Sequence, residues 1–227
     1  MTEPLVVDLE TVATDAALAE PYPEAERHAP KNYVKLEAIQ AWREADRAKW
    51  QAERAGTCAL SPLLGRIVAI GYALPCADGP AFAVQLARLE AEEPALLRDF
   101  WTQVAVAVGR IVTWNGLGFD LRFAVVRSIV HGVEPSVPGR VVQSWFRRYA
   151  THPHFDVRAV LNNWDNRAEG TLTEWCRALG VEHENGVTGA DVAGLYQAGE
   201  FTKIAAHCES DVRSTHALYR KVAGFFT

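Results

Sequence analysis

Residues 65–74, which read GRIVAIGYAL, are the segment that most limits how this chain can fold. Nearly every side chain in it is apolar or small, and the run shows no regular alternation with polar residues. A strand of this composition is typically buried on both faces of its sheet. The segment therefore predicts a central strand with a layer of structure packed against each side.

The rest of the chain predicts the sheet and its covering layers. Further strands are expected at 4–10, 81–87 and 110–115, the second pairing with residues 65–74 as a hairpin. Helices are expected at 35–55, where Gly56 stops the helix, and at 92–108, 120–132, 157–163, 171–179, 189–196 and 201–223. Residues 13–34 are predicted to be irregular, and residues 133–156 to be a mixed stretch. This order is typical of a three-layer α/β domain with a mixed central sheet flanked by helices.

The length of the chain fits one sizeable domain. The 227 residues are expected to form a single domain over residues 1–227, with a helical insertion at about 13–59. The helix within that insertion has a narrow apolar stripe on a highly charged surface. It either packs on the outside of the domain or lies beside a substrate groove.

Charge and cysteine content limit the classes of function. The net charge of −5 argues against non-specific binding to nucleic acid, although a local basic patch remains compatible with it. The four cysteines are scattered without a CxxC pair, which predicts reduced thiols and argues against structural zinc. The sequence contains neither a signal-peptide pattern nor an apolar run long enough to span a bilayer. We therefore expect a cytoplasmic protein that does not interact with membranes.

Two acids interrupt the first predicted strand. Asp8 and Glu10 are two residues apart, so their side chains lie on the same face of the strand. Nearby carboxylates repel each other unless a cation lies between them, and hard divalent ions prefer carboxylate oxygens. The pair predicts part of a metal site, or else a strand that ends in solvent with both acids exposed.

The last predicted helix places a third acid on its buried face. Asp211 lies within an apolar stripe formed by Ile204, Cys208, Thr215, Leu218 and Val222. A carboxylate on such a face is costly unless a partner or a metal ion neutralises it. His207 lies one turn earlier, close enough to share its surroundings. The two residues are either part of a metal site or a buried pair that serves the structure.

A fourth acid follows a glycine-rich turn. Residues 113–120 read TWNGLGFD, so a strand runs into a turn and Asp120 enters the next helix. Asp120 either stabilises that helix end or adds a carboxylate to the rim of the same sheet.

Together these motifs resemble a known superfamily. DLE at 8–10, NGLGFD at 115–120 and HCESD at 207–211 are similar, in order and spacing, to the three motifs of the DEDD 3′–5′ exonucleases, which have the ribonuclease-H-like fold. The closest likeness is to predicted exonucleases related to the proofreading domain of family B DNA polymerases. The likeness includes residues 60–73, 114–123, 154–156 and the segment from 170 through the final helix, and so covers most of the chain.

The resemblance implies a reaction and a set of site residues. Asp8, Glu10, Asp120 and Asp211 would hold two divalent metal ions, Mg²⁺ or Mn²⁺, against the scissile phosphate. Thr11, Asn115 and Phe119 would bind the terminal nucleotide, with Phe119 stacking on a base. The implied activity is removal of nucleoside monophosphates from the 3′ end of single-stranded DNA.

One residue departs from the family pattern. One branch of the superfamily has Tyr-x-x-x-Asp in the third motif and the other has His-x-x-x-x-Asp, whereas this chain has His207-x-x-x-Asp211. His207 is the candidate general base, directly or through a water, since imidazole titrates near neutral pH.

Other interpretations remain open from the sequence. The same chemistry could act on RNA 3′ ends, because selectivity depends on how the 2′-hydroxyl is received. A catalytically weak nucleic-acid-binding module and an acidic interaction domain are the non-nuclease alternatives, and no protein partner is implied. His154 and Asp156 are predicted to form a structural pair. The arginines that could guide a phosphate backbone are Arg122, Arg127, Arg147 and Arg148.

Overall fold

A five-stranded mixed sheet forms the centre of the computed structural model, which describes residues 3–77, 79–165, 167–168, 170–184 and 186–226. The strand order is β3-β2-β1-β4-β5, with bounds β1 Leu5–Ala13, β2 Gly65–Leu74, β3 Ala81–Leu86, β4 Ile111–Thr113 and β5 His154–Asp156. The pairs β1/β2 and β2/β3 are antiparallel, whereas β1/β4 and β4/β5 are parallel. The predicted mixed sheet is confirmed, and residues 65–74 are buried along nearly their whole length.

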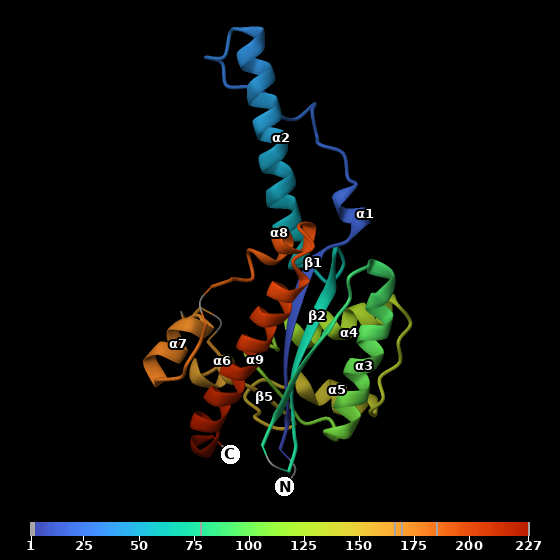
Figure 1. Ribbon diagram of the computed structural model, residues 1–227, viewed down its shortest axis with the longest axis vertical. Helices are drawn as coiled ribbons and strands as arrows, with labels where there is room; N and C mark the ends of the chain where they lie inside the picture. Colours follow the sequence, from blue (N-terminus) through green and yellow to red (C-terminus); the bar gives the residue numbers. More distant parts are fainter. Residues whose placement is uncertain (1–2, 78, 166, 169, 185, 227) are drawn as a thin grey trace.

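Helices cover both faces of this sheet (Figure 1). One face carries α3 Glu93–Val106, α4 Asp120–Val130 and α5 Gly139–Trp145, and the other carries α6 Val157–Leu161, α7 Leu172–Leu179 and α9 Phe201–Val222. The remaining helical segments are α1 Asp15–Leu18, α2 Leu36–Ala59, α8 Val192–Gln197 and the short 3-10 turns η1 Glu90–Glu92 and η2 Ala223–Phe225. Within the described part of the chain, no helix combines the length and the apolar run that crossing a membrane requires.

The alternation of side chains along β1 divides the core between these layers. Leu5, Val7 and Leu9 pack in the cluster beneath α3, α4 and α5, whereas Val6 packs in the cluster beneath α6, α7 and α9. Asp8 shares the face of Val6, as a period of two requires. The predicted alternation therefore directs the Asp8 side of β1 toward α9.

Helix α2 extends past the predicted stop at Gly56 and ends at Ala59. The prediction was wrong because Ala55 and Cys58 in the last turn are buried, Cys58 against Ala13 and Ala17. This packing offsets the cost of a glycine within a helix, about 1 kcal/mol relative to alanine.

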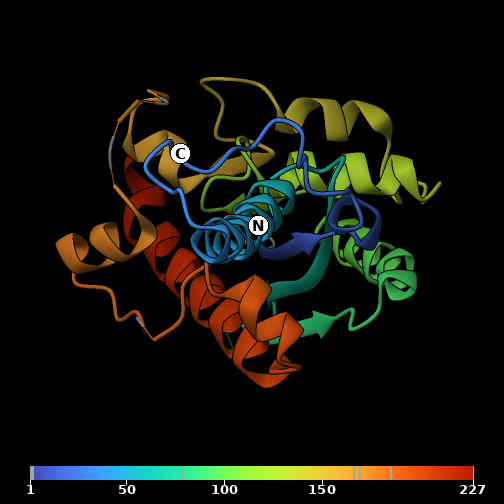
Figure 2. The same ribbon diagram turned by 90° about the horizontal axis from the view of Figure 1, so that it is seen from above.

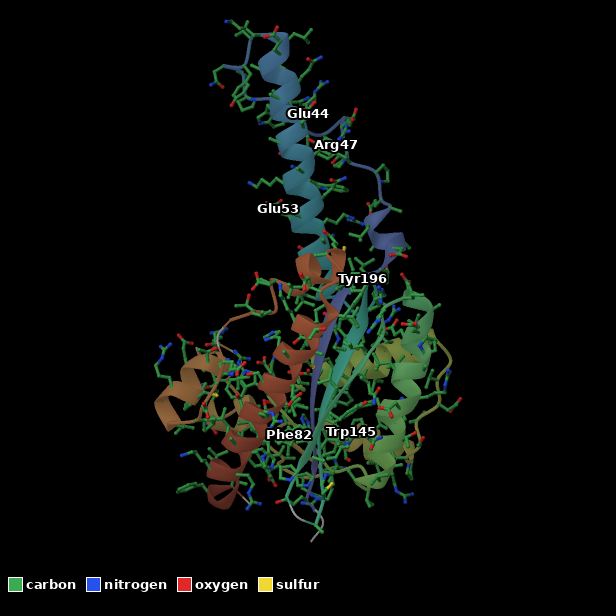
Figure 3. All side chains as sticks on the ribbon, in the orientation of Figure 1. Glu44, Arg47, Glu53, Phe82, Trp145 and Tyr196 are labelled. Atoms are coloured by element: carbon green, nitrogen blue, oxygen red, sulfur yellow. The ribbon has the colours of Figure 1, made fainter. Side chains whose placement is uncertain are left out.

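The N-terminal part of α2 projects beyond the sheet, and Figure 2 views this projection end-on. Figure 3 places Glu44 and Arg47 on the projecting part and Glu53 nearer the domain. Leu36 at the start of the predicted apolar stripe is 70% exposed, so the stripe does not clamp the helix onto the domain.

Two elements lie within the stretch that was predicted as mixed. Helix α5 depends on Trp145, whose buried indole stacks on Trp101 with ring centroids 5.7 Å apart and donates to the Gly109 carbonyl at 2.8 Å. Strand β5 has only three residues and forms through parallel pairing with β4. Both depend on contacts distant in sequence, which a local pattern does not report.

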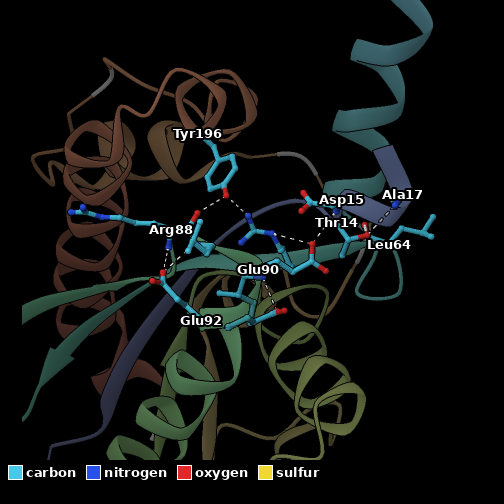
Figure 4. A network of polar contacts seen from close by, with 12 residues as sticks. Thr14, Asp15, Ala17, Leu64, Arg88, Glu90, Glu92 and Tyr196 are labelled. Atoms are coloured by element: carbon cyan, nitrogen blue, oxygen red, sulfur yellow. Dashed lines mark hydrogen bonds and ion pairs between the residues drawn. The ribbon is translucent and has the colours of Figure 1, made fainter. Parts of the chain in front are cut away.

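A polar network holds α8 against the sheet (Figure 4). The buried Arg66 on β2 donates to the hydroxyl of Tyr196 on α8, and its guanidinium lies 4.8 Å from the Tyr196 ring centroid. The Tyr196 hydroxyl donates in turn to the Arg88 carbonyl. Glu90, beside Arg66, accepts from the Asp15 backbone amide at 3.0 Å. The network links α8 and the N-terminus of α1 to β2 and to the residues that follow β3.

Candidate active site

Strand β1 presents two acids toward α9. Asp8 is half-buried and Glu10 is 6% exposed, so the interpretation of both acids as exposed at a strand end is wrong. Possible ligand atoms of Asp8, Glu10 and Cys208 lie within 4.8 Å of one another. The β1/β2 register shifts between Glu10 and Thr11, and such a bulge re-aims side chains. The four consecutive residues from Asp8 to Thr11 all border one cavity.

Two further acids approach from separate helices. Asp211 lies on the face of α9 that covers the sheet and lines the same cavity as Asp8 and Glu10. Asp120, the first residue of α4, is 6% exposed and accepts a hydrogen bond from the Leu9 amide at 3.1 Å. Asp120 thus contacts β1 between its two acids, although it is not among the described residues that line the cavity.

The four carboxyl groups influence one another's ionisation. Burial, followed by the charges of Glu10, Asp120 and Asp211, raises the pKa of Asp8 well above its ordinary value. The pKa of Glu10 is raised by burial and then by Asp211 and Asp120. Burial raises the pKa of both Asp120 and Asp211 to about 7. Without a cation the cluster therefore resists full ionisation.

His207 lies between two of these acids. Its Nε2 is 3.4 Å from Glu10 Oε1, and its Nδ1 is 3.7 Å from Asp211 Oδ1. Burial and then the charge of His183 lower its pKa, which keeps the imidazole neutral and able to accept a proton at neutral pH. The unusual spacing of this histidine therefore still places the ring at the acids.

The cavity holding these groups has a volume of about 740 Å³. Asp8, Glu10, Asp211 and His207 line it, and no lysine or arginine does among the residues that the structure describes. Its outer walls come from the last turns of α2 and from residues 189–193, largely through glycine and alanine. The C-terminal part of α2 thus lies beside the acid-lined cavity, in line with the second interpretation of that helix.

The predicted nucleotide-binding residues divide between two cavities. Thr11 and Phe119 line the acid-bearing cavity, and the Thr11 hydroxyl donates to the Ala59 carbonyl at 2.7 Å, which fixes the end of α2 to β1. Asn115 lines a second cavity instead, together with Gly118 and Arg158. Residues 115–120 form the turn between the two cavities.

Sequence reasoning assigned no site role to two features. Cys208 was placed on the buried stripe of α9, yet its sulfur lies at the acids, 3.8 Å from the Asp8 carbonyl oxygen. Its position three residues before Asp211, on the same helix face, was the available signal. The sequence of residues 189–193 gave no indication that they form a wall of the cavity, because glycine and alanine are common in loops that have no functional role. The cysteines are free, as predicted.

Two predictions about neighbouring residues need correction. Arg127 is buried and pairs with Glu93 at 2.6 Å, so it cannot guide a phosphate backbone. His154 and Asp156 take their hydrogen bonds from other residues, although the charge of Asp156 opposes the lowering of the His154 pKa by burial, so the two still interact. His154 contacts the Thr113 hydroxyl at 2.8 Å, and the two Asp156 oxygens accept from the Leu117 and Ala159 amides.

A family model described as a predicted 3′–5′ exonuclease related to the exonuclease domain of PolB matches residues 60–226. The chain belongs to this exonuclease family. The matched part contains Asn115, Asp120, His207 and Asp211 in the order expected of the family, whereas β1 and its two acids precede it. The comparison with curated proteins found no match.

A solved structure supports the fold of this exonuclease-family chain. The family B DNA polymerase from the hyperthermophilic archaeon Pyrobaculum calidifontis is similar over 97% of this chain, with a TM-score of 0.62 and 20% identity. This chain spans 24% of that polymerase. The ribonuclease-H-like fold predicted from the motifs is therefore confirmed.

The donor set of the cavity fits a hard divalent ion. Exonucleases of this kind depend on divalent metal ions, and the described cluster offers carboxylate oxygens. Asp211 Oδ1 is buried without a hydrogen-bond partner, and none of the four acids pairs with a described lysine or arginine. Such oxygens are the ligands that Mg²⁺ and Mn²⁺ prefer.

Proposed function

We propose that this protein is a metal-dependent 3′–5′ exonuclease that hydrolyses phosphodiester bonds at the 3′ end of single-stranded DNA and releases nucleoside monophosphates. The observation that carries this proposal is the convergence of Asp8, Glu10, Asp211 and His207 on one cavity that no described lysine or arginine lines. Asp8, Glu10, Asp120 and Asp211 are the proposed ligands of two divalent ions, Mg²⁺ or Mn²⁺. Bound there, the two ions supply water activation and stabilisation of the leaving 3′ oxygen.

The side chains around the acids have complementary roles in this proposal. Phe119 and Thr11 receive the terminal nucleotide at the wall of the cavity, and Asn115 fixes the adjoining turn. His207 accepts the proton of the attacking water, because its ring lies between Glu10 and Asp211 and its lowered pKa leaves the imidazole unprotonated at neutral pH. A cavity of about 740 Å³ has room for a ligand of nucleotide size, which favours a frayed or single strand over an intact duplex.

A digestion ladder tests the function and the sugar preference together. DNA and RNA oligonucleotides labelled at the 5′ end are incubated with Mg²⁺, Mn²⁺ or EDTA. We expect the DNA to shorten stepwise from its 3′ end only with metal. Faster shortening of RNA would assign the same chemistry to an exoribonuclease. Retarded migration without cleavage would contradict the enzyme and favour a nucleic-acid-binding module.

The role of His207 has its own test. His207→Ala is expected to lower kcat by about 10²-fold, since that is the usual contribution of a positioned base. His207→Tyr introduces the tyrosine that one branch of the superfamily has at this spacing. This variant is expected to retain more activity than His207→Ala. The exposed His28→Ala serves as the control, and calorimetry checks that Mn²⁺ affinity is kept. Unchanged kcat in both His207 variants would show that another group accepts the proton.

A further inference from the structure

A second cavity, of about 420 Å³, adjoins the candidate active site across the turn 115–120. Asn115 and Gly118 of that turn line the second cavity, whereas Phe119 lines the acid-bearing one. The opposite wall of the second cavity is built by Phe146, Arg148, Arg158 and Trp164. We call this second cavity, defined by these residues, the upstream pocket.

The upstream pocket combines positive charge with aromatic surface. Arg148 is exposed and its guanidinium donates to the Trp164 carbonyl at 3.4 Å. Arg158 is half-buried and donates to Asn115 Oδ1 at 3.1 Å, which links the wall to the turn. Phe146 is 37% exposed, so part of its ring is open to a ligand. Arginine beside open aromatic rings is the combination that single-stranded nucleic acid binds.

The acids near the pocket are already engaged. Asp156 is buried, and each of its oxygens accepts a backbone amide hydrogen bond. Asp165 accepts from the Arg167 amide at 2.9 Å. Arg148 and Arg158 donate to neutral carbonyl and amide oxygens rather than to these acids, so an anionic ligand is compatible with the pocket.

The backbone around the pocket adopts conformations that non-glycine residues rarely use. Asn115 has φ 148°, Tyr149 62°, Asn163 49° and Trp164 56°. Among the described non-glycine residues only Val108 also has a positive φ. Strained backbone of this kind gathers at ligand sites, where the surrounding structure holds it in place. The Tyr149 and Trp164 rings pack 5.5 Å apart, which holds the strained pair together.

We propose that the upstream pocket binds a nucleotide of the single strand next to the terminal one. The base lies against Phe146 and Trp164, and the phosphate is held by Arg148 and Arg158. This inference rests on the proposed function and extends it, because it identifies the path by which the strand reaches the acids. The terminal nucleotide is hydrolysed in one cavity while its neighbour is held in the other.

Strand affinity tests the pocket without any hydrolysis. Fluorescein-labelled hexathymidylate and hexauridylate are titrated in EDTA and followed by anisotropy. For whichever strand binds more tightly, Phe146→Ala and Arg148→Glu are expected to raise Kd about tenfold, the usual cost of losing one stacked base or phosphate contact. Arg140→Glu reverses the charge of an exposed residue on α5 that does not line the pocket, and should change Kd less than about twofold. Circular dichroism checks that each variant is folded.

Two substrates of different length distinguish a defect in the upstream pocket from a defect at the acids. Thymidine 5′-p-nitrophenyl phosphate reaches only the acid-bearing cavity, whereas the hexanucleotide occupies both. The two pocket variants should lose about tenfold in kcat/KM on the hexanucleotide and keep the wild-type rate on the short ester. The pocket would be overturned by an unchanged Kd in both variants or by equal losses on both substrates. Equal weakening of binding by Arg140→Glu, or a wild-type protein that binds neither strand, would also overturn it. A wild-type protein that binds strands through the pocket yet hydrolyses neither substrate would instead contradict the proposed function alone.

Discussion

Asp8→Asn is expected to abolish digestion of 3′ ends, with a loss of about 10³-fold or more in kcat/KM. The substitution keeps the size of the side chain and removes the carboxylate at the centre of the acidic cluster. The charges of all three other acids raise the pKa of Asp8, so Asp8 interacts with every member of the set. The measurement is the initial rate of shortening of a labelled single strand at saturating Mg²⁺ or Mn²⁺.

Matched variants on α9 show whether the loss belongs to the site. Asp211→Asn should lose activity to a similar degree, because Asp211 lines the same cavity. Glu209→Gln, two residues away, removes an acid that pairs with Arg213 at 2.6 Å instead, and should keep the wild-type rate. An Asp8→Asn protein that is folded and digests at the wild-type rate would refute the assigned acids.

Metal-free protein is expected to lose stability as the pH rises from about 4 to about 7. The pKa values of Asp120 and Asp211 are raised to about 7, so the folded state binds more protons than the unfolded state across this range. Stability falls with pH wherever the unfolded state binds fewer protons. The contribution of these protonated acids is therefore present at the low end of the range and is lost as the pH passes about 7.

Thermal unfolding in EDTA and in metal measures this linkage. In EDTA, the Tm of Asp211→Asn minus the Tm of the wild type should increase as the pH rises, because the variant lacks the titrating carboxyl. At pH 8, Mn²⁺ at about 100 times its Kd should raise the Tm of the wild type by about 5–10 °C. The metal should stabilise Asp211→Asn much less. A difference in Tm between the two proteins that does not vary with pH would contradict the raised pKa.

The central layer of this protein was predictable because its signals are local. The apolar run of β2 and the alternation of β1 each report burial through side chains only one or two positions apart. The stripe of α9 likewise marked Asp211 as an acid on a buried helix face. The order of the acidic motifs then indicated the family, and the match over residues 60–226 confirmed it.

Other features depended on contacts between distant residues. Strand β5 exists because β4 supplies its parallel partner, and α2 passes Gly56 because its last turn is buried against β1 and α1. Arg127 appeared available from its sequence neighbours, whereas Glu93 from another helix neutralises it.

The sequence by itself thus determined which faces of the strands and of α9 are buried and which acids those faces carry. Only the tertiary structure decided how the site is enclosed: that Thr11 turns toward Ala59, that His207 lies between Glu10 and Asp211, and that the turn 115–120 separates two cavities. The reason is physical. Burial of a face follows from the periodicity of one segment, but a cavity is the space left between segments, and its shape is set by how they pack.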